Sequence, residues 1–414
     1  MEFYIQEWLN LLVRWLHITT GIAWIGASFY FNWLEGRLET ASPNKKKEGI
    51  KGELWAVHGG GFYEINKYHL APKTLPKTLH WFKWEAYITW FSGMGLLSII
   101  YYWGAESYLL APESSLTPVQ AVTISVVSLL VGWLVYDLLC RSALFEQEVA
   151  FSLILFGLIT FAAWGYSQLF SGRASYIHVG ALMGTMMVGN VFRVIIPSQR
   201  KLVTAAENGD ESFDPAIARH ALLRSRHNNY LTLPLLFIMI SGHYAMTYGS
   251  EWNWVILSVL AAASVLVRHF FNRRNQGAVL PWLWPSAAVM MLTLAFVIKP
   301  QAVAQIPVEE QHAFDEGEVV EIVNARCSTC HSNTPTDVLF QSPPGGLVFL
   351  DYPSIVNKAD QIYAQSVQTQ IMPLANRSGM TDEERQLLGQ WYQQLKSEGG
   401  QAMKAAVEKA PDKS

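Results

Sequence analysis

Charged residues are scarce in this 414-residue sequence: they make up 15% of it, whereas hydrophobic residues make up 51%. So low a charge content is atypical of a water-soluble protein and typical of a chain with several membrane spans. The sequence also lacks a basic stripe or a basic domain, which excludes the usual kind of nucleic-acid-binding protein. Up to about residue 299 long apolar runs alternate with polar connectors, and from Lys299 onward the sequence stays polar and charged. We therefore expect an integral membrane domain over residues 1–299 and a soluble region after it.

The start of the sequence lacks the basic segment of a cleaved signal peptide. The first residues, MEFYIQEW, instead contain Glu2 and Glu7 ahead of the first apolar run. We expect this run to be a retained helix that begins on the outer side of the membrane.

Long apolar runs reach the length that a membrane-spanning helix needs, about 20 residues. Eight segments qualify: 9–34, 84–104, 119–139, 149–170, 176–197, 230–248, 253–271 and 279–298. Tryptophan and tyrosine lie at the ends of several segments, as interfacial anchors do. The segment 230–248 is the weakest, because Pro234 and His243 interrupt it. The sequence therefore predicts an all-α fold that begins with a polytopic bundle of about eight spans in a lipid bilayer.

Lysine and arginine are unevenly divided between two alternating sets of connectors. The sets are 35–83, 140–148, 198–229 and 272–278 on one side, and 105–118, 171–175 and 249–252 on the other. The first set holds 17 basic residues and the second holds one. Basic connectors tend to stay cytoplasmic. An even number of spans then places the N-terminus and the C-terminal region on the non-cytoplasmic side, in the periplasm or its equivalent.

Cysteine is rare, yet two of the three cysteines, Cys327 and Cys330, stand together in NARCSTCHSN with His331 directly after them. CxxCH is the attachment signature of c-type haem: the thiols bond to the porphyrin and the histidine becomes an iron ligand. A structural zinc site would need four ligands, and His312 is the only other histidine of the region. A thioredoxin-like site would stand in a βαβ context, which is absent. We therefore predict one covalent haem c, with His331 as an axial ligand of its iron.

A methionine is a common second axial ligand in small cytochromes. Met372, in TQIMPLAN, is the predicted second ligand, because Pro373 stiffens the loop that carries it. Met380 is the rival. It directly precedes a predicted helix start at which Thr381 and Glu384 form a capping-box pattern, so there we expect a hydrophobic staple.

The helix predicted after Thr381 carries an apolar stripe, formed by Leu387, Leu388, Trp391, Tyr392 and Leu395. We expect it to pack on the haem or on the helix that ends at Arg326. Residues 309–398 thus read as a mono-haem cytochrome c domain of the class I type. Residues 300–308 would be a linker and residues 399–414 a disordered tail.

Three histidines lie inside predicted spans, all in the outer half: His17, His178 and His243. Ionisable groups within spans are functional candidates. Three interpretations stay open. They could hydrogen-bond between helices, ligate a second haem of the b type or another metal, or line a pocket in which one acts as a catalytic base.

Other polar and small residues of the spans have plainer interpretations. The glycines of the first and fifth spans are predicted to allow close helix packing: Gly21, Gly26, Gly180, Gly184 and Gly189. Asp137 and Arg268 stand at inner ends. The stretch RSRHNNYLTLP (224–234) is typical of a basic, polar entry to a span. The triplet Gly59–Gly61 beside His58 is either a plain loop or an ordered binding loop.

Three membrane stretches carry a resemblance to a known family: LVRWLHITTGIAWIGASFYFNWLE (12–35), HGGGFYEINKY (58–68) and RSRHNNYLTLPLLFIMISGHY (224–244). The chain resembles the membrane-bound cytochrome c urate oxidases (urate hydroxylases) of Gram-negative bacteria over nearly its whole length. The resemblance implies an eight-helix domain fused to a cytochrome c and the oxidation of urate to 5-hydroxyisourate. It also implies that electrons pass through the haem to a respiratory acceptor, such as a cytochrome c or a terminal oxidase, rather than to oxygen. It assigns no catalytic residue, so the candidates remain His17, His178 and His243.

A different class of function also stays open. The membrane part could be a non-catalytic conduit that carries electrons from quinol through a b-type haem to haem c. A difference spectrum would distinguish the two, because only the conduit requires a b-type band.

Overall fold

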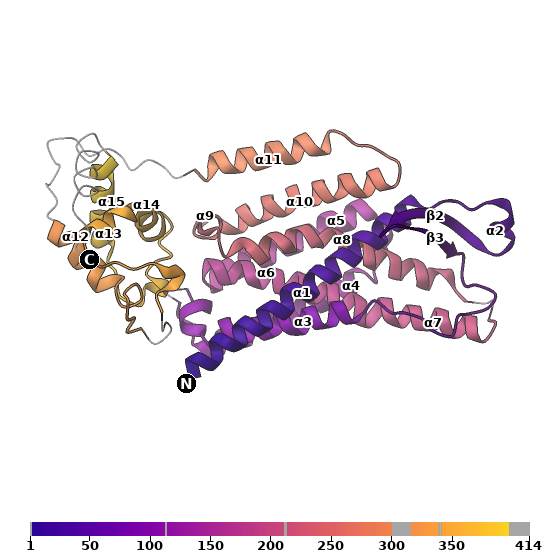
Figure 1. Ribbon diagram of the computed structural model, residues 1–414, viewed down its shortest axis with the longest axis horizontal. Helices are drawn as coiled ribbons and strands as arrows, with labels where there is room; N and C mark the ends of the chain where they lie inside the picture. Colours follow the sequence, from indigo (N-terminus) through magenta and orange to yellow (C-terminus); the bar gives the residue numbers. More distant parts are fainter. Residues whose placement is uncertain are drawn as a thin grey trace.

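The computed structural model describes residues 2–111, 114–210, 213–299, 316–337, 340 and 342–396. Long helices form a bundle, and a smaller C-terminal helical unit lies at one end of it, close to the N-terminus (Figure 1). The opposite end of the bundle carries a β-hairpin. The predicted linker 300–308 and tail 399–414 lie outside the described residues.

The bundle is built from helices of very different length. They are α1 (Glu2–Arg37), α3 (Trp84–Leu96), η1 (Leu97–Tyr102), η2 (Ala105–Leu109), α4 (Pro118–Leu139), η3 (Ala143–Glu146), α5 (Glu148–Leu169), α6 (Gly172–Asn190), η4 (Val191–Ile195), α7 (Ile196–Glu207), α8 (Pro215–Ser241), α9 (Ala245–Tyr248), α10 (Asn253–Asn275) and α11 (Leu283–Val297). All eight segments predicted as spans are helical over most of their length. Helix α8 continues through Pro234 and ends before His243.

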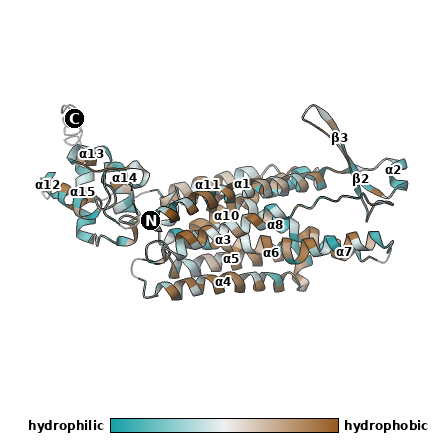
Figure 2. Cartoon of the chain, turned by 60° about the horizontal axis from the view of Figure 1, so that its bottom comes forward, coloured by the Kyte–Doolittle hydropathy of each residue, from teal (hydrophilic) through white to brown (hydrophobic). Residues whose placement is uncertain are grey.

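Within the described residues, four helices are long and apolar enough to cross a membrane: α4, α5, the continuous helix from α6 to α7, and α10. Helix α11 is apolar but shorter, with 15 residues. The outward faces of α4 and α5 are apolar as well, since Val119 and Val149 are each 75% exposed. Hydrophobic colour runs along the bundle helices, whereas the C-terminal unit is largely hydrophilic (Figure 2). Such apolar outer faces are typical of helices that contact lipid.

The connector 35–83 departs from the all-α prediction, because it folds into an antiparallel sheet. Its strands are β1 (Glu39–Thr40), β2 (Ile50–His58) and β3 (Gly61–Tyr68), beside the short helix α2 (Pro43–Lys47). Gly59 and Gly60 have φ angles of 58° and 78° and form the two-residue turn between β2 and β3. Two consecutive positive φ angles favour glycine in a tight hairpin. The glycine triplet is therefore a hairpin turn.

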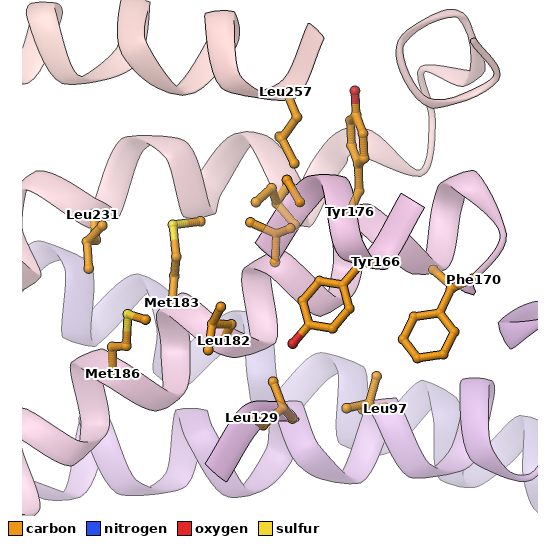
Figure 3. Packing of buried hydrophobic residues seen from close by; sticks show 14 of the residues in the cluster. Leu97, Leu129, Tyr166, Phe170, Tyr176, Leu182, Met183, Met186, Leu231 and Leu257 are labelled. Carbon is orange, nitrogen blue, oxygen red and sulfur yellow. The ribbon is translucent and has the colours of Figure 1, made fainter. Parts of the chain in front are cut away.

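The main core of the bundle surrounds α6, which α3, α4, α5, α8 and α10 all contact. Figure 3 shows its centre, where Met183 and Met186 of α6 lie between Leu231 of α8 and Leu129 of α4. Helix α6 is accordingly the most buried of the helices that are long enough to span a membrane. It therefore fixes the positions of its neighbours.

The C-terminal unit has a separate core. Its elements are α12 (Glu316–Arg326), η6 (Pro344–Gly346), α13 (Tyr352–Asn357), α14 (Ala359–Ile362), η7 (Tyr363–Gln368), η8 (Leu374–Asn376) and α15 (Asp382–Lys396). Leu388 and Trp391 of α15 pack with Val319 and Val323 of α12. This confirms the expectation that the apolar stripe of the last helix faces the helix ending at Arg326.

Candidate functional site

The CxxCH motif begins where helix α12 ends. The backbone N–H of Cys327 donates to Val323 O at 2.8 Å, and the N–H of His331 donates to Cys327 O at 2.9 Å. These bonds continue the helix as tight turns, so both thiols and the imidazole stay within one short segment. Cys327 also packs against the core of the C-terminal unit.

The imidazole of His331 has a defined tautomer. Its Nδ1 lies 3.0 Å from Leu347 O, and a carbonyl oxygen only accepts hydrogen bonds, so Nδ1 carries the proton. Burial lowers the pKa of His331 below its usual value, although the bond to Leu347 opposes this. The ring is therefore neutral near pH 7 and keeps a lone pair on Nε2. A bond from the second nitrogen to a backbone carbonyl is the usual way of orienting a metal-binding histidine.

The two thiols of the motif have raised pKa values. Burial raises the pKa of Cys327 to about 12, with a further contribution from the neighbouring Cys330. Burial also raises the pKa of Cys330. Redox-active cysteines have lowered pKa values because the thiolate is the reactive form. Both sulfurs are free in the structure. The motif therefore lacks the electrostatics of a thiol–disulfide site.

A pocket with about 750 Å³ of empty space, open to solvent, lies beside the motif. Cys330 and Thr329 line it, together with Asp337, Pro373 and Arg377. Residues adjacent to His331 and residues adjacent to Met372 thus line the same pocket.

The two candidate methionines lie in different surroundings. Met372 is half-buried in a loop that is held at both polar backbone atoms: its N–H donates to Gln365 O, and its carbonyl accepts from Arg385 at 2.8 Å. Met380 is only 3% exposed and belongs to the core of the C-terminal unit. The capping box between Thr381 and Glu384, predicted for the helix that follows, is present. Met380 thus belongs to the core of the unit, whereas Met372 lies in the loop directly before Pro373, which lines the pocket.

The loop around Met372 also contacts the bundle. Arg377 Nη1 donates to Ser107 Oγ of η2 at 3.3 Å, and Ile371 packs against the main bundle core. Thr369 lies so close to Gly249 that a Cβ at position 249 would be 2.8 Å from Thr369 Cβ. We call this contact between 369–377 and the bundle the junction. It brings the pocket of the C-terminal unit against one end of the bundle.

The three span histidines lie in three separate environments. His178 of α6 is fully buried among aromatic rings, and both its nitrogens are bonded, Nδ1 to Ala174 O and Nε2 to Ser125 Oγ. His17 of α1 donates from Nδ1 to Thr89 O at 2.9 Å and has no partner at Nε2 among the described residues. His243 is exposed just after α8. No contact joins any two of them within the described residues.

The bonds of His178 define a short chain of hydroxyl groups. Since Nδ1 donates to a carbonyl, Nε2 of the neutral ring accepts from the Ser125 hydroxyl at 2.7 Å. Ser125 Oγ then accepts from Tyr102 O–H at 2.7 Å. The chain links α6 through α4 to η1. It satisfies His178 completely, so this histidine lacks a free nitrogen for a metal.

The family model described as urate oxidase N-terminal matches residues 3–299. The chain belongs to the urate oxidase N-terminal family. No curated protein and no solved structure shows a significant match to it. The family region coincides with the bundle and ends before the C-terminal unit. Membership relates the bundle, where the three histidines and the hydroxyl chain lie, to oxidoreductases that act on urate.

The urate oxidase N-terminal region also contains a buried polar network that the sequence did not predict. Arg224 of α8, 1% exposed, donates to Asp137 of α4 at 2.7 Å and to Asn190 of α6 at 2.9 Å. The Asn190 amide in turn donates to Tyr136 O–H and to Asn228. The polar stretch 224–234, expected as a surface entry to a span, is thus turned into the bundle.

A second network of the same region joins α8 to α10. Arg268 donates to Asn229 at 2.8 Å and to Asn272, and its guanidinium lies 4.1 Å from the ring centre of Phe29 on α1. The sequence places Asp137 and Arg268 at the inner ends of spans. It does not identify their partners on other helices, because Arg224 is 87 residues from Asp137 and Asn229 is 39 residues from Arg268.

Proposed function

We propose that the chain is a membrane-bound urate oxidase whose electrons leave through a c-type haem in the C-terminal unit. Urate would be converted to 5-hydroxyisourate, and a respiratory acceptor, not oxygen, would take the electrons. Membership of the urate oxidase N-terminal family is the observation that carries this proposal.

The chemistry of the C-terminal unit fits a covalent haem. Cys327 and Cys330 supply free thiols at the required spacing, and His331 presents an unprotonated Nε2 because Leu347 holds the proton on Nδ1. Both thiols have raised pKa values, which disfavours the competing thiol-redox use. A haem bound here would accept one electron at a time. Met372 would be the second ligand of the haem iron, because Met380 is part of the core of the C-terminal unit.

The overall reaction balances as urate plus water giving 5-hydroxyisourate, two protons and two electrons. Because a single haem c carries one electron, the electrons leave in two successive transfers. The protons need a base. His17, His178 and His243 are the candidates of the proposal, and among them His17 combines partial burial with a free Nε2.

The arrangement of the chain supports a periplasmic C-terminal unit. The start of α1 and the C-terminal unit lie at the same end of the bundle, and the basic connector 35–83 lies at the other (Figure 1). Basic connectors favour the cytoplasm. In the proposal, a bacterial inner membrane surrounds the bundle, and the haem-bearing end meets a cytochrome c or a terminal oxidase.

Anaerobic mixing of the detergent-purified protein with urate tests the proposal. We expect a c-type pyridine haemochrome, and urate should reduce the haem with two equivalents per 5-hydroxyisourate formed. Absence of haem reduction by urate would refute the proposal, and a b-type band in the difference spectrum would favour a conduit. Retained full activity in alanine variants of all three histidines would exclude them as the base.

The axial methionine has a matched pair of variants. Met372→Ala should lower the midpoint potential of the haem, because a methionine ligand raises it. Met380→Ala should lower thermal stability and leave the potential unchanged. The reverse pattern would assign the ligand to Met380.

A further inference from the structure

One cation at the junction end of the bundle has no visible partner. Arg173 is the second residue of α6, and its Nε is buried without a hydrogen-bond partner among the described residues. No carboxylate pairs with it in the part of the chain that the structure describes. It is also the single basic residue counted above in the outer set of connectors. The side chain as a whole is half-buried, but a buried guanidinium nitrogen without a partner indicates a missing acceptor.

The surroundings of Arg173 are aromatic and cationic. The hydroxyls of Tyr101, Tyr108 and Tyr248 lie near enough to interact with its charge, and so does a second cation, Arg14 of α1. Arg14 is exposed on α1 and donates to the Asn10 side chain. Among the described residues no carboxylate pairs with Arg14 or Arg173, so both positive charges would attract an anion bound beside Arg173.

The backbone holds Arg173 in place at this site. The hydroxyl of Ser171, the N-cap of α6, donates to Tyr108 O at 2.8 Å and ties the helix start to η2. At the other side, a Cβ on Gly242 would lie only 3.4–3.7 Å from the guanidinium, so the bare backbone at the end of α8 lies against it. Elements from three parts of the family region therefore converge on one side chain.

The site lies next to the pocket of the C-terminal unit. Tyr108 interacts electrostatically with Arg173 and also with Cys330, Asp337 and Arg377 of that unit. Three of its four partners therefore line the pocket beside the CxxCH motif. Helix η2 joins the two places: Ser171 at the start of α6 donates to Tyr108 O, and the pocket residue Arg377 donates to Ser107.

We propose that Arg173 binds urate as its anion, at the junction and directly beside the haem pocket. The inference rests on the proposed function. Urate at neutral pH is a flat, delocalised anion with adjacent nitrogen and oxygen acceptors, which matches the planar fork of a guanidinium. The tyrosine rings provide faces and hydroxyls for a flat heterocycle. The substrate would thereby lie within one aromatic residue of the electron acceptor.

A haem propionate has the same planar, anionic chemistry as the proposed ligand, and the test separates the two. Urate is titrated calorimetrically into protein whose haem has been reduced with dithionite, so that binding proceeds without turnover. The proteins compared are wild type, Arg173→Gln, Arg173→Lys and the control Arg219→Gln, whose side chain is exposed and paired with Glu146. The haem midpoint potential of each is measured in parallel.

We expect Arg173→Gln to weaken urate binding at least tenfold, Arg173→Lys to weaken it less, and Arg219→Gln to bind as wild type does. The midpoint potential should stay unchanged in all four. Unchanged urate affinity in Arg173→Gln and Arg173→Lys would overturn the site, and a lowered midpoint potential with unchanged affinity would assign Arg173 to a propionate. If wild type itself fails to bind urate, the proposed function fails and not the site alone. The haem spectrum and monodispersity of Arg173→Lys control for folding.

Discussion

Replacing Gly189 by alanine should destabilise the bundle, whereas the same change at Gly184 should not. Both glycines lie in α6, five residues apart. A Cβ at Gly189 would lie 1.8 Å from Nε1 of Trp133 on α4, while a Cβ at Gly184 meets no atom within 4 Å. Three atoms of the rigid indole ring would lie within 3 Å of the new Cβ, so the ring or the helix that carries it would have to shift.

The two substitutions should change the stability of the bundle in opposite directions. Overpacking of this kind costs about 1–3 kcal/mol, whereas alanine in place of an open helical glycine contributes about 0.5–1 kcal/mol of stability. With about 2–4 °C per kcal/mol for a domain of moderate size, the melting temperatures should differ by about 3 °C or more. Thermal unfolding followed by tryptophan fluorescence in one detergent measures this. Equal melting temperatures for the two variants would refute the packing of α6 against α4 described above.

Two further changes test the charged groups. Asp137→Ala should lower the free energy of unfolding by about 3–5 kcal/mol, because it leaves the buried Arg224 without its carboxylate. The double variant Asp137→Ala/Arg224→Leu should recover most of the melting temperature. No recovery would contradict the pairing. In the C-terminal unit, burial alone would raise the pKa of Glu384, but hydrogen bonds from Arg326 and from the Thr381 backbone outweigh it and lower the pKa. The pair therefore stabilises the unit above the ordinary carboxyl pKa of about 4.5 and loses this effect as the pH falls below it. Glu384→Gln should remove that part of the acid sensitivity in a circular-dichroism titration, and an unchanged acid transition would contradict the assignment.

Local patterns predicted the helical elements and the ends of several of them. The apolar runs became helices because a run of about 20 apolar residues fixes length and character without reference to the rest of the chain. The capping box at Thr381 also depends on neighbours within a few residues. The hairpin β2–β3 was not predicted, although three glycines beside alternating apolar and polar residues are typical of a tight turn. The connector was interpreted from its many basic residues instead.

The buried networks required contacts that no local pattern contains. Asp137 and Arg224 are 87 residues apart, and each alone is typical of the polar end of a span. Helix α6 brings them together, since it packs against both α4 and α8 and contributes Asn190 between them. Which charges pair in such a bundle depends on which helices pack against the same neighbour. A local sequence pattern does not contain this information about tertiary structure.

Arg173 is the clearest example of a residue whose role depends on tertiary contacts that the sequence does not reveal. In the sequence it is one basic residue in a short outer connector, where it counts only as an exception to the distribution of charge. Its importance comes from what surrounds it in the fold: a second guanidinium, three tyrosines, a bare glycine backbone and no carboxylate among the described residues. A structural arginine in apolar surroundings acquires a partner, as Arg224 did with Asp137. The two arginines of the bundle differ in that Arg224 pairs with a carboxylate, whereas Arg173 pairs with none among the described residues, and the proposed ligand site rests on this difference.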